Sequence, residues 1–352
     1  MTNDTTIILP AEWAPQSGIM LSWPHKNTDW KDILDEVIPC YVAIAKEIIK
    51  REKLLVVCKN IEEVKKALGN IDYNQVIFRE MDTNDTWARD HGPISVIAND
   101  YPFICDFTFN GWGLKFAANY DNQITKKLFA SHTFAPEIHY QNMKHCVLEG
   151  GSIESDGCGT ILTTSTCLLS ENRNEYKDKN EIGEYLKMIF GVKRILWLDH
   201  GYLSGDDTDS HIDTLARFCD PETIAYVKCD DKDDEHFEAL SLMEKQLGVF
   251  RTLEGKPYRL IPLPMADTVY DNEERLPATY ANFLIINGAV LFPAYHSPKD
   301  EIVKQQLQQV FSDREIIGVN CLPLIKQHGS LHCVTMQFPE KFISEFKNLI
   351  VT

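Results

Sequence analysis

The segment His328-Gly329-Ser330-Leu331-His332-Cys333-Val334-Thr335 is the last of five turn-rich, strand-flanked segments in this chain of 352 residues. The other four lie around Asp90, Glu149, His211 and Asn282, and subtraction gives separations of 59, 62, 71 and 51 positions. Recurrence at a roughly constant period is typical of one supersecondary unit repeated about an axis, although a period this long and irregular also leaves coincidence open. The sequence therefore predicts a five-bladed ring in which each polar turn faces a common centre.

The regions between these turns alternate between two apolar patterns. Spacing of three and four predicts helices over 30–50, 61–68, 119–131, 180–190, 235–247 and 299–311. Runs rich in Val, Ile and Leu predict strands over 53–58, 75–79, 194–198, 223–228, 282–286, 289–293 and 315–319. No low-complexity run or Pro/Ser-rich linker divides the chain, so we expect one α/β domain over residues 1–352.

Composition limits the classes of partner. The net charge is −17, from 52 acidic and 35 basic residues, which disfavours nucleic acid as a partner. The charge itself serves either solubility or the attraction of a cationic substrate.

The ten cysteines include no C-x-x-C pair and no compact framework, which is typical of reduced thiols in a cytosolic protein without a structural metal. The N-terminal stretch MTNDTTIILPAEWAPQSGIMLSWP lacks a basic start and a long apolar run. We therefore expect a cytoplasmic protein with neither a signal peptide nor a membrane anchor.

The five turns carry chemically complementary side chains. A guanidinium is planar, rich in N–H donors and permanently charged, so carboxylates are its natural ligands. Asp90 and Asp213 are candidates to hold its two edges while Cys333 attacks its central carbon. A cysteine needs a nearby cation to become a thiolate, and either a protonated His211 or the substrate supplies one. His211 is then the candidate acid for the leaving ammonia and the candidate base for the hydrolytic water.

Glu149 is the candidate for orienting His211 and stabilising its charged form. Each of these residues has an ordinary structural alternative when taken singly. A lone cysteine is more often a small buried apolar residue, and Glu149-Gly150-Gly151 could be a plain turn. Their co-occurrence in the recurring segments favours a metal-independent, guanidine-cleaving cysteine enzyme with no cofactor.

The chain also resembles a known family. The resemblance extends over nearly the whole sequence and is carried by Trp23-Pro24, Trp30, Asn84-Asp85-Thr86-Trp87-Ala88-Arg89-Asp90-His91-Gly92-Pro93, Glu149-Gly150-Gly151, Asp206-Asp207-Thr208-Asp209-Ser210-His211-Ile212-Asp213 and His332-Cys333. With these motifs the sequence resembles the agmatine deiminase family, also described in bacteria as peptidyl-arginine deiminase-like, within the guanidine-modifying superfamily.

The resemblance implies a five-bladed α/β propeller, the pentein fold, built from pseudo-fivefold ββαβ repeats around a central active site. It assigns Cys333 as nucleophile, His211 as acid and base with Glu149 beside it, and Asp90 and Asp213 as guanidinium ligands. It also places Asp207 near the substrate's amine, Trp87 in the wall of the substrate channel with core packing as its alternative, and the chain in a homodimer.

Two departures from the family pattern bear on the substrate. Gln327-His328-Gly329 stands where the family usually has three glycines, and Asp207 stands where the family often has Glu. An Asp is shorter by one methylene, which leaves a longer or differently placed amine, or a free amino acid, as alternatives for the pocket.

The preferred function is hydrolysis of agmatine to N-carbamoylputrescine and ammonia through a covalent amidino-cysteine intermediate, in putrescine and polyamine biosynthesis. Acids near His211 and the lack of an obvious basic partner favour an amine over a carboxylate in the substrate. The alternatives are deimination of free or peptidyl arginine, amidino transfer to an amine, and a non-catalytic guanidine-binding protein. A Ser-His-Asp hydrolase is disfavoured because the chain has no G-x-S-x-G segment.

Overall fold

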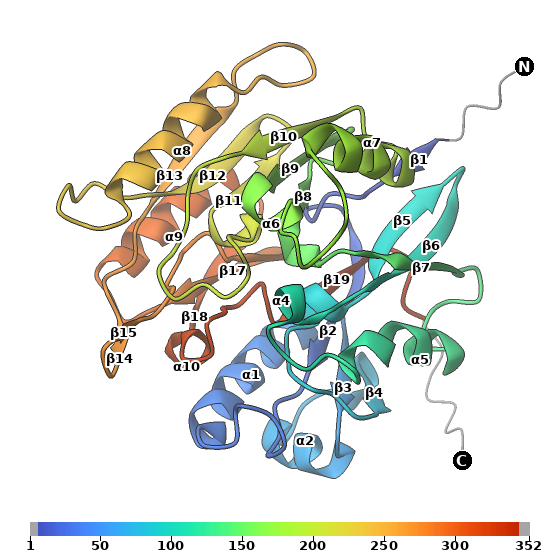
Figure 1. Cartoon of the computed structure of the whole chain (residues 1–352). Coiled ribbons are helices and arrows are strands. Elements are labelled where there is room, and N and C mark those ends of the chain that lie inside the picture. Colours follow the sequence, from blue (N-terminus) through green and yellow to red (C-terminus); the bar gives the residue numbers. More distant parts are fainter. Residues whose placement is uncertain (1–5, 345–352) are drawn as a thin grey trace, which may run out of the picture.

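One topological unit recurs five times in the computed structural model, which describes residues 6–344 (Figure 1). Each unit has an antiparallel strand pair, a helix, and a further strand that lies parallel to the second strand. Four units are continuous in sequence. They are β5(Ile94–Ala98), β6(Tyr101–Thr108), α5(Ile124–Ala130) and β7(His139–Val147); β8(Ile153–Ser155), β9(Thr160–Thr164), α7(Lys179–Phe190) and β10(Arg194–Leu198); β11(Ala216–Asp220), β12(Thr223–Lys228), α8(Phe237–Val249) and β13(Arg259–Pro264); and β16(Leu284–Ile286), β17(Ala289–Ala294), α9(Lys299–Val310) and β18(Glu315–Asn320).

The fifth unit joins the two ends of the chain. Strand β19(Thr335–Pro339) pairs antiparallel with β2(Gln16–Ser22), and β3(Lys53–Cys58) and β4(Val76–Glu80) continue that sheet in parallel. Helices α1(Leu34–Ile49) and α2(Ile61–Leu68) connect those strands. Because one sheet needs strands from both ends, the N-terminal and C-terminal segments are bound to each other.

Shorter elements complete the chain. β1(Ile7–Ile8) pairs with β5, and β14(Tyr270–Asp271) forms a hairpin with β15(Glu274–Arg275). The remaining helices are α3(Ala88–His91), α4(Gly111–Leu114), α6(Ser165–Leu168) and α10(Leu322–Ile325), with 3-10 turns at η1(Tyr73–Gln75), η2(Asp121–Gln123), η3(Gly150–Ser152) and η4(Ile212–Thr214). Within residues 6–344, no helix has both the length and the apolar character needed to span a membrane.

Local sequence accounts for these elements. The central strands are nearly continuous apolar runs, as in β3 and β12, because both faces of each sheet are covered. Helix α7 begins where the Asp178 side chain accepts hydrogen bonds from the first free N–H groups, and it ends at Gly191, whose φ of 65° suits a left-handed cap. Figure 1 shows α1, α5, α7 and α8 toward the outside of the molecule, so the strands are the inner layer.

The predicted α/β class is confirmed, and every predicted helix and strand is present. The largest differences are at two helix starts, where the helix predicted over 30–50 begins at Leu34 and that over 119–131 begins at Ile124. Residues before Leu34 form turns instead, and the Trp30 indole donates to Asp85, which holds that segment away from the helix axis.

Candidate active site

The five predicted turns each lie directly before the first strand of one sheet. Asp90 is in α3 before β5, Glu149 precedes β8, His211 precedes β11, Asn282 precedes β16 and Cys333 precedes β19. Contacts connect the turns in cyclic order. They are Gly151 N to Asp90 Oδ1 at 3.0 Å, His211 Nε2 to Glu149 Oε2 at 3.7 Å, Asn282 Nδ2 to Asp213 O at 3.3 Å, Asn282 Nδ2 to Cys333 Sγ at 3.2 Å, and Arg89 N to Cys333 O at 3.1 Å. Residues up to 244 positions apart therefore meet in one small volume.

Gly151 marks the point where the side chains converge. A Cβ atom at this glycine would lie 2.6 Å from His211 Nδ1, 2.8 Å from Asp90 Oδ1 and 3.1 Å from Asp213 Oδ2. No other residue type leaves this space, so Glu149-Gly150-Gly151 is more than a plain turn.

Cys333 is 5% exposed and faces carboxylates. Its Sγ lies 3.7 Å from Asp213 Oδ2. Burial, together with the negative charges of Asp213 and Asp90, raises the pKa of this thiol well above its usual value. Cys333 is therefore a neutral thiol until a cation enters the site.

Asp90 and Asp213 are both fully buried but differ in their partners. Asp90 accepts from the Trp112 indole at 3.0 Å and from Gly151 N, yet burial raises its pKa to about 6. Asp213 Oδ2 accepts from His332 Nδ1 at 2.8 Å, and Asp213 Oδ1 has no hydrogen-bond partner among residues 6–344. Although burial opposes it, the His332 contact lowers the pKa of Asp213. Neither carboxylate is paired with a Lys or Arg in the described chain, so both are available to a cationic ligand.

His211 lies between two acids. Its Nδ1 is 3.6 Å from Asp90 Oδ1 and its Nε2 is 3.7 Å from Glu149 Oε2, which are ion-pair distances rather than hydrogen bonds. Burial alone would lower the pKa of His211, but the charges of Asp90 and Cys167 and contacts with Cys167 and Glu149 raise it well above the usual value. His211 is therefore held as an imidazolium, the form able to protonate a leaving group.

Arg173 holds Glu149 in its charged form. Arg173 Nε donates to both Glu149 oxygens, at 2.9 and 3.1 Å, and both side chains are fully buried. Against the effect of burial, His211 and Arg173 lower the pKa of Glu149. The other end of the same guanidinium binds Thr208 O and Asp209, so Arg173 connects the histidine's carboxylate to the loop that carries Asp207.

A pocket of about 580 Å³ leads from Cys333 to the surface. It is lined by Asp29, Asp85, Trp87, Asp90, Trp112, Phe116, Asp207, Thr208, Gln327, His328, Gly329 and Cys333. Four of these side chains are carboxylates and three are aromatic, which suits a cation with an apolar stem. Trp87 both lines the pocket and contacts Trp30 and Gly329, so its channel and packing roles coexist.

Asp207 has basic neighbours that sequence reasoning missed. Lys115 Nζ donates to Asp207 O at 2.6 Å and to Asp209 Oδ1 at 2.8 Å. Burial raises the pKa of Asp207, and the nearby His328 opposes that effect. His328 has a φ of 66°, and its Nδ1 donates to Gly205 O at 2.8 Å. The histidine therefore occupies a backbone conformation that favours glycine and lines the pocket beside Asp207.

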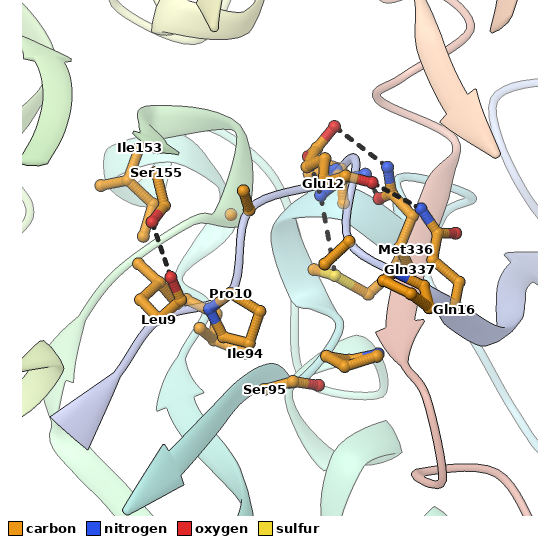
Figure 2. Close-up of a pocket in the computed structure, with 16 residues that line it drawn as sticks. Leu9, Pro10, Glu12, Gln16, Ile94, Ser95, Ile153, Ser155, Met336 and Gln337 are labelled. Carbon is orange, nitrogen blue, oxygen red and sulfur yellow. Dashed lines mark hydrogen bonds and ion pairs between the residues drawn. The ribbon is translucent and has the colours of Figure 1, made fainter. Parts of the chain in front are cut away.

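A second charged cluster surrounds Glu12, one of the residues labelled in Figure 2. Glu12 accepts from Arg89, Arg217, Gln337 and His332, and Arg217 also binds Glu154. We call these six residues the Glu12 cluster. Three of them, Glu12, Arg89 and Gln337, line a separate pocket of about 620 Å³, and Figure 2 shows Glu12 and Gln337 pointing toward each other at its edge. His332 connects the cluster to Asp213.

Two groups of donor atoms have the spacing of metal ligands, but arginines occupy both. Glu149, Cys167 and His211 form one group, and Glu12, Glu154 and His332 form the other. Arg173 pairs with Glu149 in the first group, and Arg217 pairs with both acids of the second. A metal ion would have to displace a buried guanidinium, so neither group fits a resident metal.

Comparison with known proteins gives one family. The family model described as Porphyromonas-type peptidyl-arginine deiminase matches residues 8–339. The agmatine deiminase of Pseudomonas syringae pv. tomato is 32% identical over 95% of this chain and 96% of its own length. A crystal structure described as a putative arginine deiminase from Porphyromonas gingivalis is 52% identical, with a TM-score of 0.93 over 96% of this chain and 100% of that one.

A substrate-bound agmatine deiminase from C. jejuni is 38% identical, with a TM-score of 0.90 over 97% of this chain and 98% of that one. A dimethylarginine dimethylaminohydrolase, at 10% identity and a TM-score of 0.50, shares the fold alone. The chain therefore has a mixed α/β fold that is similar to the fold of this dimethylarginine dimethylaminohydrolase.

Proposed function

Because the chain belongs to the Porphyromonas-type peptidyl-arginine deiminase family, we propose that it hydrolyses agmatine to N-carbamoylputrescine and ammonia, a step in putrescine and polyamine biosynthesis. Agmatine deiminases such as that of Pseudomonas syringae pv. tomato are similar over nearly the full chain. The observation that carries the proposal is the convergence on Gly151 of His211, Asp90 and Asp213, beside the Cys333 sulfur.

Substrate binding relies on two carboxylates that have no Lys or Arg partner in the described chain. In the proposed complex, Asp90 and Asp213 accept hydrogen bonds from the guanidinium N–H groups and fix its carbon near Cys333 Sγ. The bound cation lowers the pKa of Asp90 and favours the thiolate of Cys333, because it offsets the charges that oppose both ionisations. The substrate therefore helps to activate its own nucleophile.

The proposed reaction has two halves. When the cation binds, the Cys333 thiol releases its proton to solvent, because His211 is already protonated. The thiolate forms a C–S bond to the guanidinium carbon, a C–N bond breaks, and His211 gives its proton to the departing ammonia. Water then attacks the amidino carbon while the now neutral His211 accepts its proton. The C–S bond breaks and the new hydroxyl group releases its proton to solvent, which leaves the neutral ureido product and the Cys333 thiolate. Glu149 stays anionic beside Arg173 and steadies the charged histidine throughout.

The far end of the substrate extends along the aromatic walls of the pocket. Trp87 packs against the methylene chain, and Asp207 accepts from the terminal ammonium. No Arg or Lys is among the residues lining this pocket in the described chain, which supports an amine rather than a carboxylate at that end.

The wider arrangement belongs to the same proposal. The cyclic order of contacts among the five turns, and the shared strand pairing of the chain ends, support a five-bladed ring of pseudo-fivefold ββαβ repeats. Residues 1–352 then form one catalytic domain. A cytoplasmic location, a homodimer, and the absence of a nucleic-acid partner complete the proposal on the grounds of composition and family resemblance.

Deimination of arginine is the second candidate function. His328 lines the pocket, and Lys115 binds the backbone of Asp207. A modest movement of either basic side chain would bring it to the substrate's far end, where it would complement a carboxylate.

The test is the release of ammonia and ureido product from agmatine, free arginine and a short arginine peptide under identical conditions. Turnover of agmatine with little turnover of the others is the expected result. Preference for arginine or the peptide would assign the second candidate, and the absence of turnover with all three would overturn the enzymatic proposal.

A further inference from the structure

His328 is the one basic side chain among the described residues that line the pocket leading to Cys333. Lys115 lies near the pocket, but its Nζ binds the loop that carries Asp207, and its side chain is not part of the lining. The charged lining groups are otherwise carboxylates. A proton gained by His328 therefore changes the balance of charge that a substrate meets in this pocket.

The orientation of the His328 ring is fixed by a hydrogen bond. Its Nδ1–H group donates to Gly205 O at 2.8 Å, and because a carbonyl oxygen only accepts, Nδ1 carries the proton of the neutral ring. Within residues 6–344, the Nε2 atom makes no hydrogen bond. The residue also has a φ of 66°, a conformation whose strain commonly persists at functional sites. Nε2 is therefore an acceptor in the neutral ring and a donor after protonation.

Asp207 and His328 lie close together at the outer end of the pocket and form no ion pair with each other in the described chain. The charge of His328 opposes the effect of burial on the pKa of Asp207, which puts the two side chains within electrostatic reach. Both are partly exposed and both line the same space. An acid and a base that face one space without pairing are available to two different charges on a ligand.

Agmatine and arginine differ only at the carbon that bears the amine, where arginine has an additional carboxylate. With either guanidinium held beside Cys333, this carbon reaches the same depth in the pocket. Asp207 suits the ammonium of both molecules. The carboxylate of arginine needs a cationic donor, and protonated His328 is the only one in the described lining. The imidazolium would repel the ammonium of agmatine, whereas the neutral ring offers it the Nε2 lone pair.

We propose that His328 selects the substrate according to pH: the neutral ring accepts a hydrogen bond from the ammonium of agmatine, and the imidazolium donates to the carboxylate of arginine. This inference rests on the proposed function of the pocket. Histidine ordinarily changes its charge between about pH 5 and 8, so arginine is favoured at the acid end of this range and agmatine at the alkaline end. The reaction at Cys333 is the same for both substrates.

Other groups at this end of the pocket also titrate or carry charge. They are Asp206, Lys115 and Glu274 near Asp207, and Asp29 and Asp85 in the lining. Burial raises the pKa of Asp85 to about 6, so its ionisation also favours a cationic ligand as the pH rises. A change in His328 itself is therefore needed to separate its effect from that of the carboxylates.

Substitution His328→Asn makes this separation. Asparagine tolerates a positive φ, and its Nδ2 can take the place of Nδ1 at Gly205 O, while the second ring nitrogen and the titratable charge are lost. Asp207 and Asp85 are unchanged. His132→Asn is the matched control, because His132 has a φ of 51°, is exposed and does not line the pocket.

The measurement is kcat/KM for agmatine and for free arginine at pH 6 and pH 8, because the ratio of the two values cancels ionisations of the reacting groups that both substrates share. At pH 6, His328→Asn should lower the value for arginine about fivefold and raise the value for agmatine about twofold, the range of partly exposed charge pairs. Between pH 6 and pH 8 the agmatine-to-arginine ratio should rise about tenfold more in the wild type than in His328→Asn. His132→Asn should match the wild type.

Changes of the same sign for both substrates at both pH values would assign His328 to packing of the loop and overturn the proposal. An equal rise of the ratio in the variant and the wild type would assign the selection to the carboxylates and would also overturn it. If His328→Asn does not fold, His328→Gly supplies the same comparison, because glycine suits a φ of 66°.

Binding tests the inference without turnover. In Cys333→Ala protein, calorimetry should show the affinity for agmatine rising relative to that for arginine from pH 6 to pH 8, and this rise should shrink when His328→Asn is added. If the wild type turns over neither substrate, the proposed function fails and these affinities still decide the role of His328. Arginine binding that is undetectable at pH 6, or equally weak with and without His328, would overturn the proposal.

Discussion

The catalytic centre and the Glu12 cluster are two buried groups of carboxylates that differ in how their charge is balanced. In the Glu12 cluster, Arg89 and Arg217 contact Glu12, and against the effect of burial they and His332 hold its pKa well below the usual value. In the catalytic centre no arginine or lysine contacts Asp90 in the described chain, and burial raises its pKa to about 6. The carboxylates of the Glu12 cluster are therefore balanced by the protein's own arginines, whereas Asp90 has no Lys or Arg partner, and in the proposed function a cationic substrate balances its charge.

Removal of the proposed nucleophile, Cys333, should reduce activity more than any other change, because it removes the reacting group and leaves the Glu12 cluster intact. In Cys333→Ala we expect kcat to fall by roughly 10⁴-fold or more, since loss of a catalytic nucleophile removes the covalent route. Agmatine binding, measured by calorimetry, should persist because the carboxylates remain. Cys158→Ala is the control, because Cys158 is exposed and free. Full activity in Cys333→Ala would refute the covalent mechanism.

The next-largest effect tests whether Asp90 and Asp213, the carboxylates without a Lys or Arg partner in the described chain, bind the guanidinium of the substrate. Asp213→Asn should lower kcat/KM for agmatine by about 10²- to 10³-fold, because one edge of the guanidinium loses a charge-assisted hydrogen bond and its charge is less compensated. Agmatine affinity in the Cys333→Ala background should fall in parallel. Asp271→Asn, in the exposed hairpin, controls for loss of one negative charge. Unchanged affinity would assign the clamp elsewhere.

Removal of the Glu12 charge from the Glu12 cluster should lower the stability of the protein. Glu12→Gln leaves the buried Arg217 and Arg89 with one negative partner fewer, so we expect the free energy of unfolding to fall by about 3 kcal/mol. Chemical denaturation near pH 7 measures it. Glu340→Gln is the control, because this exposed side chain makes no ion pair in the described chain. If Glu12→Gln has the same free energy of unfolding as the wild type, the ion pairs of the Glu12 cluster do not stabilise the fold.

Replacing the carboxylate by an amide should raise the free energy of unfolding at Asp90, whereas it should lower it at Glu12. Its pKa is raised from 3.8 to about 6, so the folded state binds its proton more tightly than the unfolded state does. The stability from that proton is present below pH 4 and is lost as the pH rises through about 6. Asp90→Asn cannot ionise, so at pH 8 it should be more stable than the wild type by about 1–3 kcal/mol, with the difference disappearing at pH 4.

Thermal unfolding of Asp90→Asn and the wild type at pH 4 and pH 8 measures this difference. Equal stability at pH 8 would mean that Asp90 carries no buried charge in the folded protein. In the same pH series, wild-type kcat/KM for agmatine should rise through about pH 6 as Asp90 ionises in the free enzyme.

The two regions also differ in how far the sequence could predict them. Asp90, His211 and Cys333 were identified because each lies in a short motif at a recurring turn, and the structure brings these turns together. Nothing local to Glu12 indicates its role, since its contact with His332 joins positions 320 residues apart. Arg173 likewise lies between elements and finds Glu149 only in the folded chain.

The elements of the fold also differ in whether the local sequence could predict them. Apolar periodicity predicted β3, β10, β12 and α2 with their observed bounds, because burial of one face or both is a local property of the sequence. The pairing of β19 with β2 has no such local signal, because it depends on the chain ends meeting. Asn282 lies between these cases. The recurrence marked its position, but only the folded chain shows that its amide contacts His332 N and Cys333 Sγ.

The smallest expected effect concerns Asp207 at the outer end of the pocket. Lys115 binds its backbone oxygen, and the charges of Lys115 and His328 lie near its carboxylate, whereas Asp90 has no Lys or Arg partner in the described chain. Because Asp207 is partly exposed, Asp207→Asn should raise KM for agmatine by about three- to fivefold, the range of an exposed ion pair, with kcat little changed. Butylguanidine lacks the terminal ammonium and is the matched substrate control, so its kcat/KM should not change. An equal loss of kcat/KM with both substrates would mean that Asp207 shapes the loop instead of binding the amine. The enzyme would then bind only the guanidinium charge of the substrate, at the buried carboxylates.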